Sequence, residues 1–312
     1  MKQARSYWER SWRLVGATAL GVTLIGCEPS NTVPAGAPIM LSFGPIDADG
    51  KPLVLLDEKG VTLPTPPLVP FRAIFDRLLD PTTLEDTLGN PKAGLATAQS
   101  PVAVPGIPVT TNFIPNGDAK NAVLLPPGPS ITVSSTCGLP SGAAVTVTLD
   151  LQKVRSHDQS TAAVAAADAT PVLSFMTEPL AVATDPKAMV DTTTGLLVVP
   201  EVEAGQTVNL IFNNRTPGDV PDPACAALLS TKGHIHVVAT IAGHPVGDLD
   251  AVVAADPMDP TKWMVSPPGT TADAAGNWPP GADITISVDA MATDLFAQPL
   301  GTEASASFKV KS

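Results

Sequence analysis

The sequence predicts an all-β protein made of two tandem β-sandwich domains. Three observations lead to this prediction: proline and glycine are frequent, short β-type runs alternate apolar with hydroxyl side chains, and one stretch recurs 139 residues further on. The 34 prolines in 312 residues are about twice the usual ~5%. Prolines this frequent would interrupt most helices, which excludes long helical bundles and coiled coils. The hydrophobic fraction of 44% is that of a chain that folds.

The first 26 residues are predicted to be a signal peptide and no part of the fold. The segment opens with the basic residues Lys2, Arg5, Arg10 and Arg13. An apolar run of 13 residues follows, from Leu14 to Gly26. This run is shorter than the ~20 residues of a transmembrane helix, but it suits the hydrophobic region of a signal peptide.

The signal ends in Leu24-Ile25-Gly26-Cys27, which resembles the lipobox of bacterial lipoproteins. In that motif the small Gly26 permits cleavage, and the Cys27 thiol takes a diacylglycerol. The resemblance implies acylation of Cys27, palmitate included, and a tether over residues 27–37. Glu28 is not the Asp that holds enterobacterial lipoproteins at the inner membrane, so we expect anchoring at the outer membrane of a bacterial cell envelope, on its periplasmic or its surface face. The alternative is an ordinary signal peptide or membrane anchor with a cysteine by chance.

The chain that follows the signal is strongly acidic. The formal net charge of the whole sequence is −12. The four basic residues of the signal and Glu9 give it +3, so −15 remains for the rest. An acidic surface repels nucleic acid and anionic lipid headgroups, so we expect no nucleic-acid partner and expect the acyl chains to hold the protein at the membrane.

Two cysteines, Cys137 and Cys225, remain once Cys27 is assigned to the lipid. In an oxidising compartment such a pair is a candidate disulfide. The alternative is two separate small hydrophobic side chains, because spacing along the chain does not give the distance between two residues.

Short runs with β-type composition are separated by Pro, Gly, Asn and Asp. The clearest are Ile39–Phe43, Val69–Phe75, Val102–Thr111, Ile131–Ser135, Val145–Leu149, Val172–Met176, Leu196–Val199, Val208–Phe212, His234–Ile241, Ile284–Val288 and Ala304–Val310. Strict alternation, as in Val145–Leu149, indicates a strand with one face in a core and one in water. The Ala-rich stretch 161–168 is interpreted as a flexible insertion, with a helical turn as the alternative.

An internal repeat divides the chain into two similar parts. Residues 139–150 align without a gap with residues 278–289, and Ala73-Ile74-Phe75-Asp76 matches Leu210-Ile211-Phe212-Asn213 at nearly the same offset. Two copies of one pattern predict two tandem domains of one fold. Residues 179–195, with Asp185-Pro186 and a run of threonines, are expected to be the linker between them.

Each copy resembles a bacterial Ig-like domain of the type found in surface-layer proteins. In the first copy the resemblance rests on Ile74-Phe75-Asp76, Asp80-Pro81-Thr82-Thr83-Leu84, Leu139-Pro140-Ser141-Gly142, Val145-Thr146-Val147 and Phe175-Met176-Thr177. In the second it rests on Ile211-Phe212-Asn213, Pro280-Gly281, Ile284-Thr285-Ile286, Thr293-Asp294-Leu295-Phe296 and Ser307-Phe308. It implies one Ig-like domain over residues 38–182 and another over 183–312. These phrases form turns and core strands, so they imply a fold and no catalytic residues.

Three histidines are the strongest metal candidates. His234 and His236 share one face of the expected strand, and His244 follows beyond a turn at Gly243. Three imidazoles are a ligand set that suits zinc. The interpretation we favour is a polar strand face, with Ile235 and Val237 directed into the core, so no metal is assigned.

Carboxylates raise a weaker suggestion of calcium. Asp47-Ala48-Asp49-Gly50 is similar to the start of a calcium loop, but the later ligands of that loop are missing, so an Asp-Gly turn is favoured. A calcium ion between the domains, held by Glu178, Asp185 or Asp191, is a second alternative.

The sequence contains no G-x-S-x-G, H-E-x-x-H or P-loop motif, and His157-Asp158 is interpreted as loop surface. Trp263 and Trp278 are candidates for stacking on a sugar, although Trp278 aligns with Leu139, which favours packing. We therefore predict a non-catalytic envelope lipoprotein that presents Ig-like domains to a protein or an envelope polymer. The alternatives are a ligand-binding lipoprotein, with calcium or a glycan at the domain junction, and then a metal-dependent enzyme.

Overall fold

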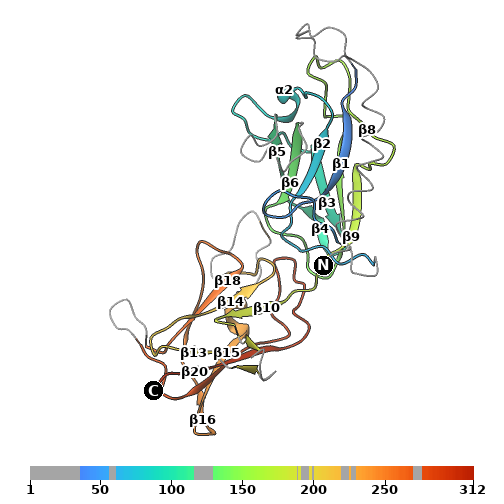
Figure 1. The fold of residues 1–312 in the computed structure, drawn as a ribbon. Helices are drawn as coiled ribbons and strands as arrows, with labels where there is room; N and C mark the ends of the chain where they lie inside the picture. The colour runs from blue at the N-terminus through green and yellow to red at the C-terminus, as the bar shows by residue number, and fades with distance from the viewer. Residues whose placement is uncertain are drawn as a thin grey trace, which may run out of the picture. The chain divides into compact units, whose positions relative to one another are not determined.

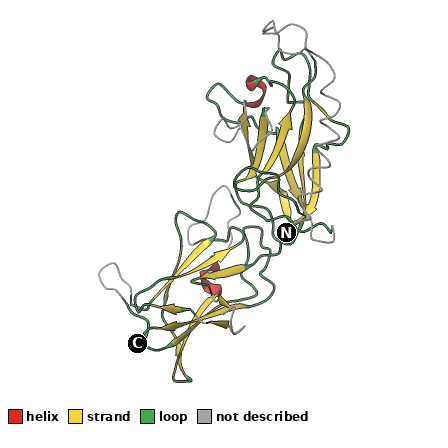
Figure 2. Cartoon of the chain, in the orientation of Figure 1, coloured by secondary structure: helices red, strands yellow, loops and turns green. Residues whose placement is uncertain are grey.

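The computed structural model describes residues 36–55, 61–115, 129–187, 189–190, 197–198, 200–218, 225, 230–269 and 276–312. Gly36–Ser312 form one compact unit. Strands dominate it, and the helices among the described residues are the single turns α2 (Pro81–Leu84) and η1 (Thr231–His234) (Figures 1 and 2). The prediction of a mostly β chain is confirmed.

Strands β1 to β9 form two sheets, which we call the N-terminal module. In spatial order, one sheet contains β5 (Val109–Ile114), β6 (Ser130–Ser135), β2 (Phe71–Phe75), β1 (Ile39–Pro45) and β8 (Val164–Ala165). The other contains β4 (Ala103–Ile107), β3 (Ala96–Ser100), β7 (Ala144–Leu149) and β9 (Val172–Met176). Neighbouring strands are antiparallel except β1 and β8, which run parallel.

Strands β10 and β13 to β20 form two further sheets, which we call the C-terminal module. One contains β10 (Val182–Asp185), β14 (Val208–Phe212), β18 (Lys262–Ser266) and β17 (Val252–Ala255). The other contains β13 (Glu201–Val202), β20 (Ala304–Val310), β19 (Asp283–Val288), β15 (Ile235–Ile241) and β16 (His244–Asp248). Strands β11 (Met189–Val190) and β12 (Leu197–Val198) pair with each other.

The two modules share the order of their eight main strands and differ in an additional edge strand, which is β8 beside β1 in one and β13 beside β20 in the other. The order β5-β6-β2-β1 corresponds to β17-β18-β14-β10, and β4-β3-β7-β9 corresponds to β16-β15-β19-β20. The aligned repeat 139–150 and 278–289 contains β7 and β19, which have equal length and occupy equivalent places. The sequence repeat therefore coincides with a repeat of topology.

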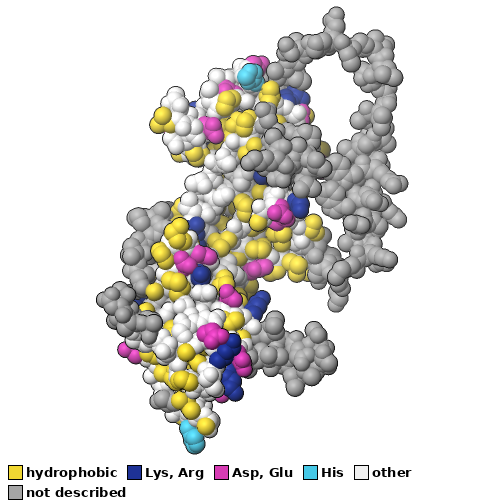
Figure 3. Space-filling model, turned by 60° about the vertical axis from the view of Figure 1, so that its left-hand side comes forward, with side chains coloured by type: hydrophobic (Ala, Val, Ile, Leu, Met, Phe, Trp, Pro, Cys, Tyr) yellow, Lys and Arg dark blue, Asp and Glu magenta, His cyan; other side chains and the backbone are white. Residues whose placement is uncertain are grey.

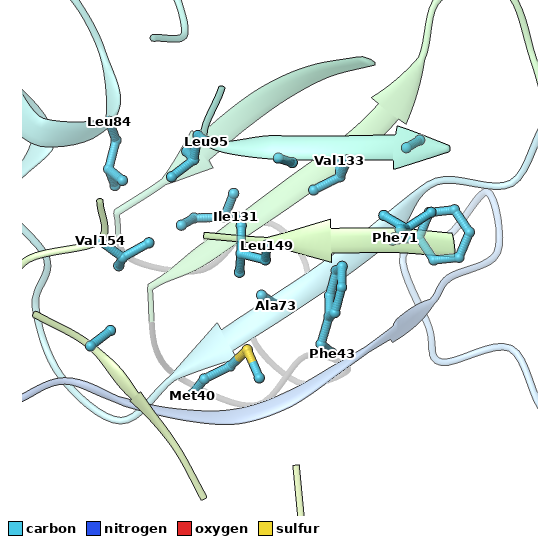
Figure 4. Packing of buried hydrophobic residues seen from close by; sticks show 14 of the residues in the cluster. Met40, Phe43, Phe71, Ala73, Leu84, Leu95, Ile131, Val133, Leu149 and Val154 are labelled. Carbon is cyan, nitrogen blue, oxygen red and sulfur yellow. The ribbon is translucent and has the colours of Figure 1, made fainter. Parts of the chain in front are cut away.

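The core of the N-terminal module lies between its two sheets. Met40, Phe71 and Ala73 come from one sheet and Leu149 from the other, and all are buried (Figure 4). The Phe71 ring lies 5.3 Å, centroid to centroid, from that of Phe175 on β9. Strand β7 buries every second residue, as the alternation predicts.

The core of the C-terminal module is built around two tryptophans. Trp278 is fully buried and packs edge-on against Phe308, with ring centroids 5.5 Å apart. Its Nε1 donates to Gln206 O at 2.7 Å. Trp263 is also buried, and its Nε1 donates to Thr216 Oγ1 at 2.8 Å. Each indole therefore buries its apolar surface while its N–H keeps a hydrogen bond.

The Phe-Asp and Phe-Asn phrases of the repeat have one role in both modules. Asp76 follows β2, and its Oδ1 accepts the N–H of Ile39 at the start of β1, at 2.7 Å. Asn213 follows β14, and its Oδ1 accepts the N–H of Ala181 just before β10, at 2.8 Å. Each side chain thus holds the entry of the first strand of its module beside the end of the neighbouring strand.

Three segments differ from their sequence-based interpretation. The run 102–111 forms two strands in different sheets, β4 and β5, because Pro108 between them has no N–H for a ladder. The stretch 161–168 contains β8, so it is neither a helical turn nor an insertion without structure. The expected linker 179–195 contains β10 and β11, because Leu180 anchors its start in the C-terminal core. The domain boundary between residues 182 and 183 stays a prediction.

The tryptophan core gives a direct test of packing. Replacing Phe308 by Ala should lower the free energy of unfolding of the C-terminal module by about 3–5 kcal/mol, because it leaves a cavity beside Trp278. Urea unfolding followed by tryptophan fluorescence measures it, since Trp263 and Trp278 are the only tryptophans after the signal. Met258→Ala, at a side chain that is 90% exposed, is the matched control and should change little. Equal stability of the two variants would contradict this packing.

Candidate functional site

The predicted lipid site lies outside the described residues. Residues 1–35, with the signal and Cys27, are not part of what the structure describes, so acylation stays a prediction. In the described part of the chain, no helix has the length and apolar character needed to cross a membrane.

Cys137 and Cys225 form a disulfide, with their Cα atoms 5.7 Å apart. Cys137 follows β6 of the N-terminal module, and Cys225 lies between β14 and η1 of the C-terminal module. The bond therefore joins the two modules covalently. The sequence left open whether these cysteines form a disulfide or are two separate small hydrophobic side chains, and the structure contains the disulfide.

Asn214 and Asp294 of the C-terminal module bind the N-terminal module beside this disulfide. Asn214 Nδ2 lies 2.7 Å from Leu139 O, 2.9 Å from Ser141 Oγ and 3.2 Å from Asp294 Oδ2, so its two hydrogens serve three acceptors. Asp294 Oδ2 also accepts the N–H of Ser141 at 2.7 Å. Ser141, Asn214 and Asp294 are all buried. We call these three side chains, with Leu139 O, the junction network.

The Asp294 carboxylate uses both oxygens as acceptors. Its Oδ1 accepts the backbone N–H groups of Phe296 and Gln298 at 2.8 and 2.9 Å, while Oδ2 receives Ser141 and Asn214. Burial raises the pKa of Asp294, and these hydrogen bonds oppose the rise only in part. The Asp294 carboxyl group therefore keeps its proton to a higher pH in the folded protein than in the unfolded chain. Its contribution to stability is complete below the unfolded pKa and is lost as the pH rises through the folded pKa.

The backbone at Gly138 leaves room for the junction network. Gly138 has a φ of +77°, a conformation that other residues rarely adopt. A Cβ atom there would lie 2.3 Å from Asn214 Oδ1 and 3.0 Å from Leu68 Cδ2. Glycine at this position therefore permits the close approach of Asn214 to the N-terminal module.

The connection between the modules is short and hydrogen-bonded on both sides. Glu178 N donates to Thr65 O at 2.9 Å, and Glu178 O accepts the N–H of Gly142 at 2.8 Å, both within the N-terminal module. The next carbonyl, Pro179 O, accepts from Asn213 Nδ2 at 2.9 Å. The chain therefore passes from one module to the other without a free linker.

His234 and His236 meet a carboxylate that the sequence analysis did not identify. His234 directly precedes β15 and Asp289 directly follows β19, and the Asp289 N–H donates to His234 O at 2.9 Å. His236 is two residues further along the chain, in β15. Asp289 Oδ2 lies 3.1 Å from His236 Nε2 and 3.6 Å from His234 Nδ1. The hydrogen bond from His236 lowers the pKa of Asp289. Ile235 and Val237 point into the core, as the polar-face interpretation predicted.

His244 does not join this cluster. His244 begins β16 and pairs with Ile241 of β15. Ile241 is five residues from His236, so about 17 Å of strand separates the two positions. Within the described residues, no group of three or more His, Cys, Asp or Glu side chains is arranged to hold a metal ion. The two imidazoles instead face the same oxygen of Asp289, so their contacts are those of ion pairs and hydrogen bonds.

The calcium suggestions find no support in the described residues. Asp47 Oδ1 accepts the N–H of Lys51 at 2.8 Å, and Gly50 has a φ of +76°, so the segment is the Asp-Gly turn that the sequence favoured. Of the carboxylates considered for an ion between the domains, Asp191 lies outside the described residues. Glu178 and Asp185 belong to no group of metal-holding side chains within the part of the chain that the structure describes.

The other candidate features are two tryptophans, the His157-Asp158 segment and one surface groove. Both Trp263 and Trp278 are buried, so neither can stack on a glycan. The segment at His157-Asp158 is a turn, in which the Ser156 and Ser160 hydroxyls lower the pKa of Asp158 to about 2. An open groove of about 720 Å³ lies between β3, β7 and β8, and its charged side chains are Asp150 and Lys153, 3.7 Å apart.

No protein-family model matches this chain, and no curated protein matches it. Among solved structures it is similar to the N-terminal part of the bacterial S-layer protein SbsC, with 9% identity and a TM-score of 0.24, over 88% of this chain and 44% of that one. It is also similar to the C-terminal domain of the Streptococcus agalactiae AgI/II polypeptide BspA, with 9% identity and a TM-score of 0.15, over 88% of this chain and 100% of that one. The chain thus spans less than half of the S-layer structure. TM-scores this low do not establish a common fold.

The residues at the junction were partly visible in the sequence. Ser141 and Asp294 lie in two of the motifs that carry the resemblance to Ig-like domains, Leu139-Pro140-Ser141-Gly142 and Thr293-Asp294-Leu295-Phe296. Asn214 directly follows the Phe-Asn phrase. Asp289 is the last residue of the aligned repeat. The sequence does not show that Ser141, Asn214 and Asp294 contact one another. It also does not show that Asp289 contacts His234 and His236.

The junction network predicts a stability effect at Asp294. An amide at this position has one acceptor oxygen, and its NH₂ group would face N–H donors. Asp294→Asn should therefore lower the free energy of unfolding by about 1–3 kcal/mol in urea unfolding. Asp283→Asn, at an exposed residue of β19, is the matched control and should be neutral. A neutral effect of Asp294→Asn would contradict the network.

The histidine cluster predicts a change in an acid titration. His236→Ala should raise the pKa of Asp289 toward its ordinary value, because it removes the hydrogen bond that lowers it. Carboxyl ¹³C NMR measures the shift, with His244→Ala as a control that leaves the pKa unchanged. Asp289 stabilises the fold above its unfolded pKa, and this contribution disappears as the pH falls through the lowered value. An unchanged Asp289 pKa in His236→Ala would show that His236 does not bind it in solution.

Proposed function

We propose that this protein is a lipid-anchored, non-catalytic component of a bacterial cell envelope that presents two Ig-like domains as a structural or interaction module. The observation that carries the proposal is the order of features in the chain. A basic region, a 13-residue apolar run and Leu24-Ile25-Gly26-Cys27 come directly before two modules of one topology. The lipid on Cys27 holds the protein at the membrane, and the modules provide the surfaces that a partner contacts.

The repeated topology supports the Ig-like assignment of both modules. In each, two mainly antiparallel sheets of four or five strands enclose one hydrophobic core. That arrangement, with short strands and many turns, is the architecture of Ig-like sandwiches. Ig-like domains commonly serve as recognition or spacer units, so a tandem pair suits a presentation role.

The surface supports a partner that is not a polyanion. On the face in Figure 3, many basic side chains lie near acidic ones. Lys262 Nζ is 3.2 Å from Asp256 Oδ2, and Lys311 Nζ is 2.6 Å from Glu203 Oε1. With the acidic net charge of the chain, this distribution disfavours nucleic acid and favours a protein or a neutral envelope polymer.

The outer faces of two equivalent sheets provide hydrogen-bonding groups for such a partner. Thr146 Oγ1 and Ser174 Oγ lie 3.0 Å apart on β7 and β9, and Thr285 Oγ1 and Ser307 Oγ lie 2.9 Å apart on β19 and β20. In both pairs the serine is exposed and the threonine half-buried, and both modules carry them in the same place. A hydroxyl can donate and accept, so these faces can bind the peptide or hydroxyl groups of an envelope component.

A ligand at the junction is the weaker candidate. The oxygens of Asp294 already accept four N–H groups, so the junction carboxylate is committed to the protein. A metal-dependent reaction at His234 and His236 is weaker still, because within the described residues these imidazoles and Asp289 are not arranged to hold a metal ion. The presentation role therefore remains the proposal.

The lipid anchor is tested at Cys27. Cys27→Ser should remove the acyl mass from the chain and release or mislocalise the protein, because serine provides no thiol for the diacylglycerol. Membrane fractionation and mass spectrometry of the N-terminal peptide measure the two effects. Ser30→Ala, in the same tether, should remain acylated and membrane-bound. An unchanged mass and distribution of Cys27→Ser would refute the anchor.

A further inference from the structure

Residues 137–141 of the N-terminal module contact three separate segments of the C-terminal module. Cys137 is bonded to Cys225, and Leu139 O accepts from Asn214 Nδ2. Ser141 N donates to Asp294 Oδ2. These partners lie in three different segments of the chain, so one short stretch carries the disulfide and every group that the N-terminal module contributes to the junction network.

We propose that the Cys137–Cys225 disulfide is a redox-operated latch on the junction between the two modules. In the oxidised protein the bond keeps residues 137–141 against the C-terminal module. In the reduced protein only non-covalent contacts and the short connection at Glu178 and Pro179 remain, and the junction opens far more often. This inference concerns the coupling of the modules and does not depend on lipidation of Cys27.

The composition of the junction explains why it needs a covalent restraint. Asn214, Asp294 and Ser141 are polar and buried, and their hydrogen bonds replace equally good bonds to water, so each contributes little net stability. Burial of the Asp294 carboxylate opposes closure, as its raised pKa indicates. Phe296 adds an apolar contact, because it packs against the N-terminal core. The closed junction therefore depends mainly on the disulfide and the short chain connection, which keep these polar groups together.

The exposure of the two cysteines sets the direction of reduction. Cys225 is partly exposed, whereas Cys137 is 1% exposed. The thiolate of a dithiol reductant attacks Cys225 Sγ, the Cys137–Cys225 bond breaks, and the Cys137 thiolate leaves and takes a proton. The second thiol of the reductant then attacks the mixed disulfide, which releases the Cys225 thiol and leaves the reductant oxidised. Two electrons and two protons are transferred, and a disulfide oxidant reverses the reaction.

Amide hydrogen exchange in the purified full chain tests the latch. The Ser141 N–H donates across the junction, so its exchange rate reports opening. Reduction with dithiothreitol should accelerate exchange at Ser141 at least tenfold and leave Val147, in the centre of β7, unchanged. Cys225→Ser should show the fast Ser141 exchange without reductant and no further response to it. Asn214→Ala, with the disulfide intact, should accelerate Ser141 less than reduction does.

Two results would overturn the proposal. One is Ser141 exchange that stays within twofold after complete reduction, which would mean that the hydrogen bonds and the short connection hold the junction by themselves. The other is equal acceleration at Ser141 and Val147, which would mean that the disulfide supports the fold of the N-terminal module. If Cys225→Ser does not fold, reduction of the unaltered chain still distinguishes these results.

Discussion

Every sheet in the two modules buries one apolar face, and the placement of the strands and turns follows from that burial. Apolar surface contributes roughly 25 cal/mol per Å² removed from water, so a sheet with one apolar face is stable only against a second such face. In the N-terminal module Phe71 and Phe175 meet across this contact, with ring centroids 5.3 Å apart, and in the C-terminal module Trp263 and Trp278 occupy it. The turns, caps and short strands all serve to bring two such faces together.

The junction between the modules is built from different interactions. Its central groups are the polar side chains of Asn214, Asp294 and Ser141, and a disulfide lies beside them. Hydrogen bonds are directional, so this network fixes how residues 137–141 meet the C-terminal module, while apolar packing supplies most of the stability within each module. In the role that we propose, a defined junction is an advantage, because a fixed geometry reduces the entropy lost when a partner binds.

Strands were predictable where the sequence alternates strongly. Strands β7 and β19 combine β-branched core residues with Thr or Ser on the other face, and both follow a Pro-Gly type turn. Strand β3 was missed because Ala96–Ser100 consists of small and polar residues with weak β-propensity, and its place between β4 and β7 compensates for this. Around strand β10 the local sequence indicates a linker, because Asp185-Pro186 and a run of threonines follow it. Pairing with β14 overrides that local signal.

By itself the sequence determined that the chain is mostly β, that its two halves repeat one pattern, and that its start resembles a lipoprotein signal. These properties are local or periodic, so composition and spacing are enough to reveal them. Three contacts become visible in the folded chain alone: the Cys137–Cys225 disulfide, the contact of Asp289 with His234 and His236, and the place of Asp294 in the junction. The partners in these contacts are about 50 to 150 residues apart, so strand register and the packing of the modules bring them together, and no local pattern encodes either.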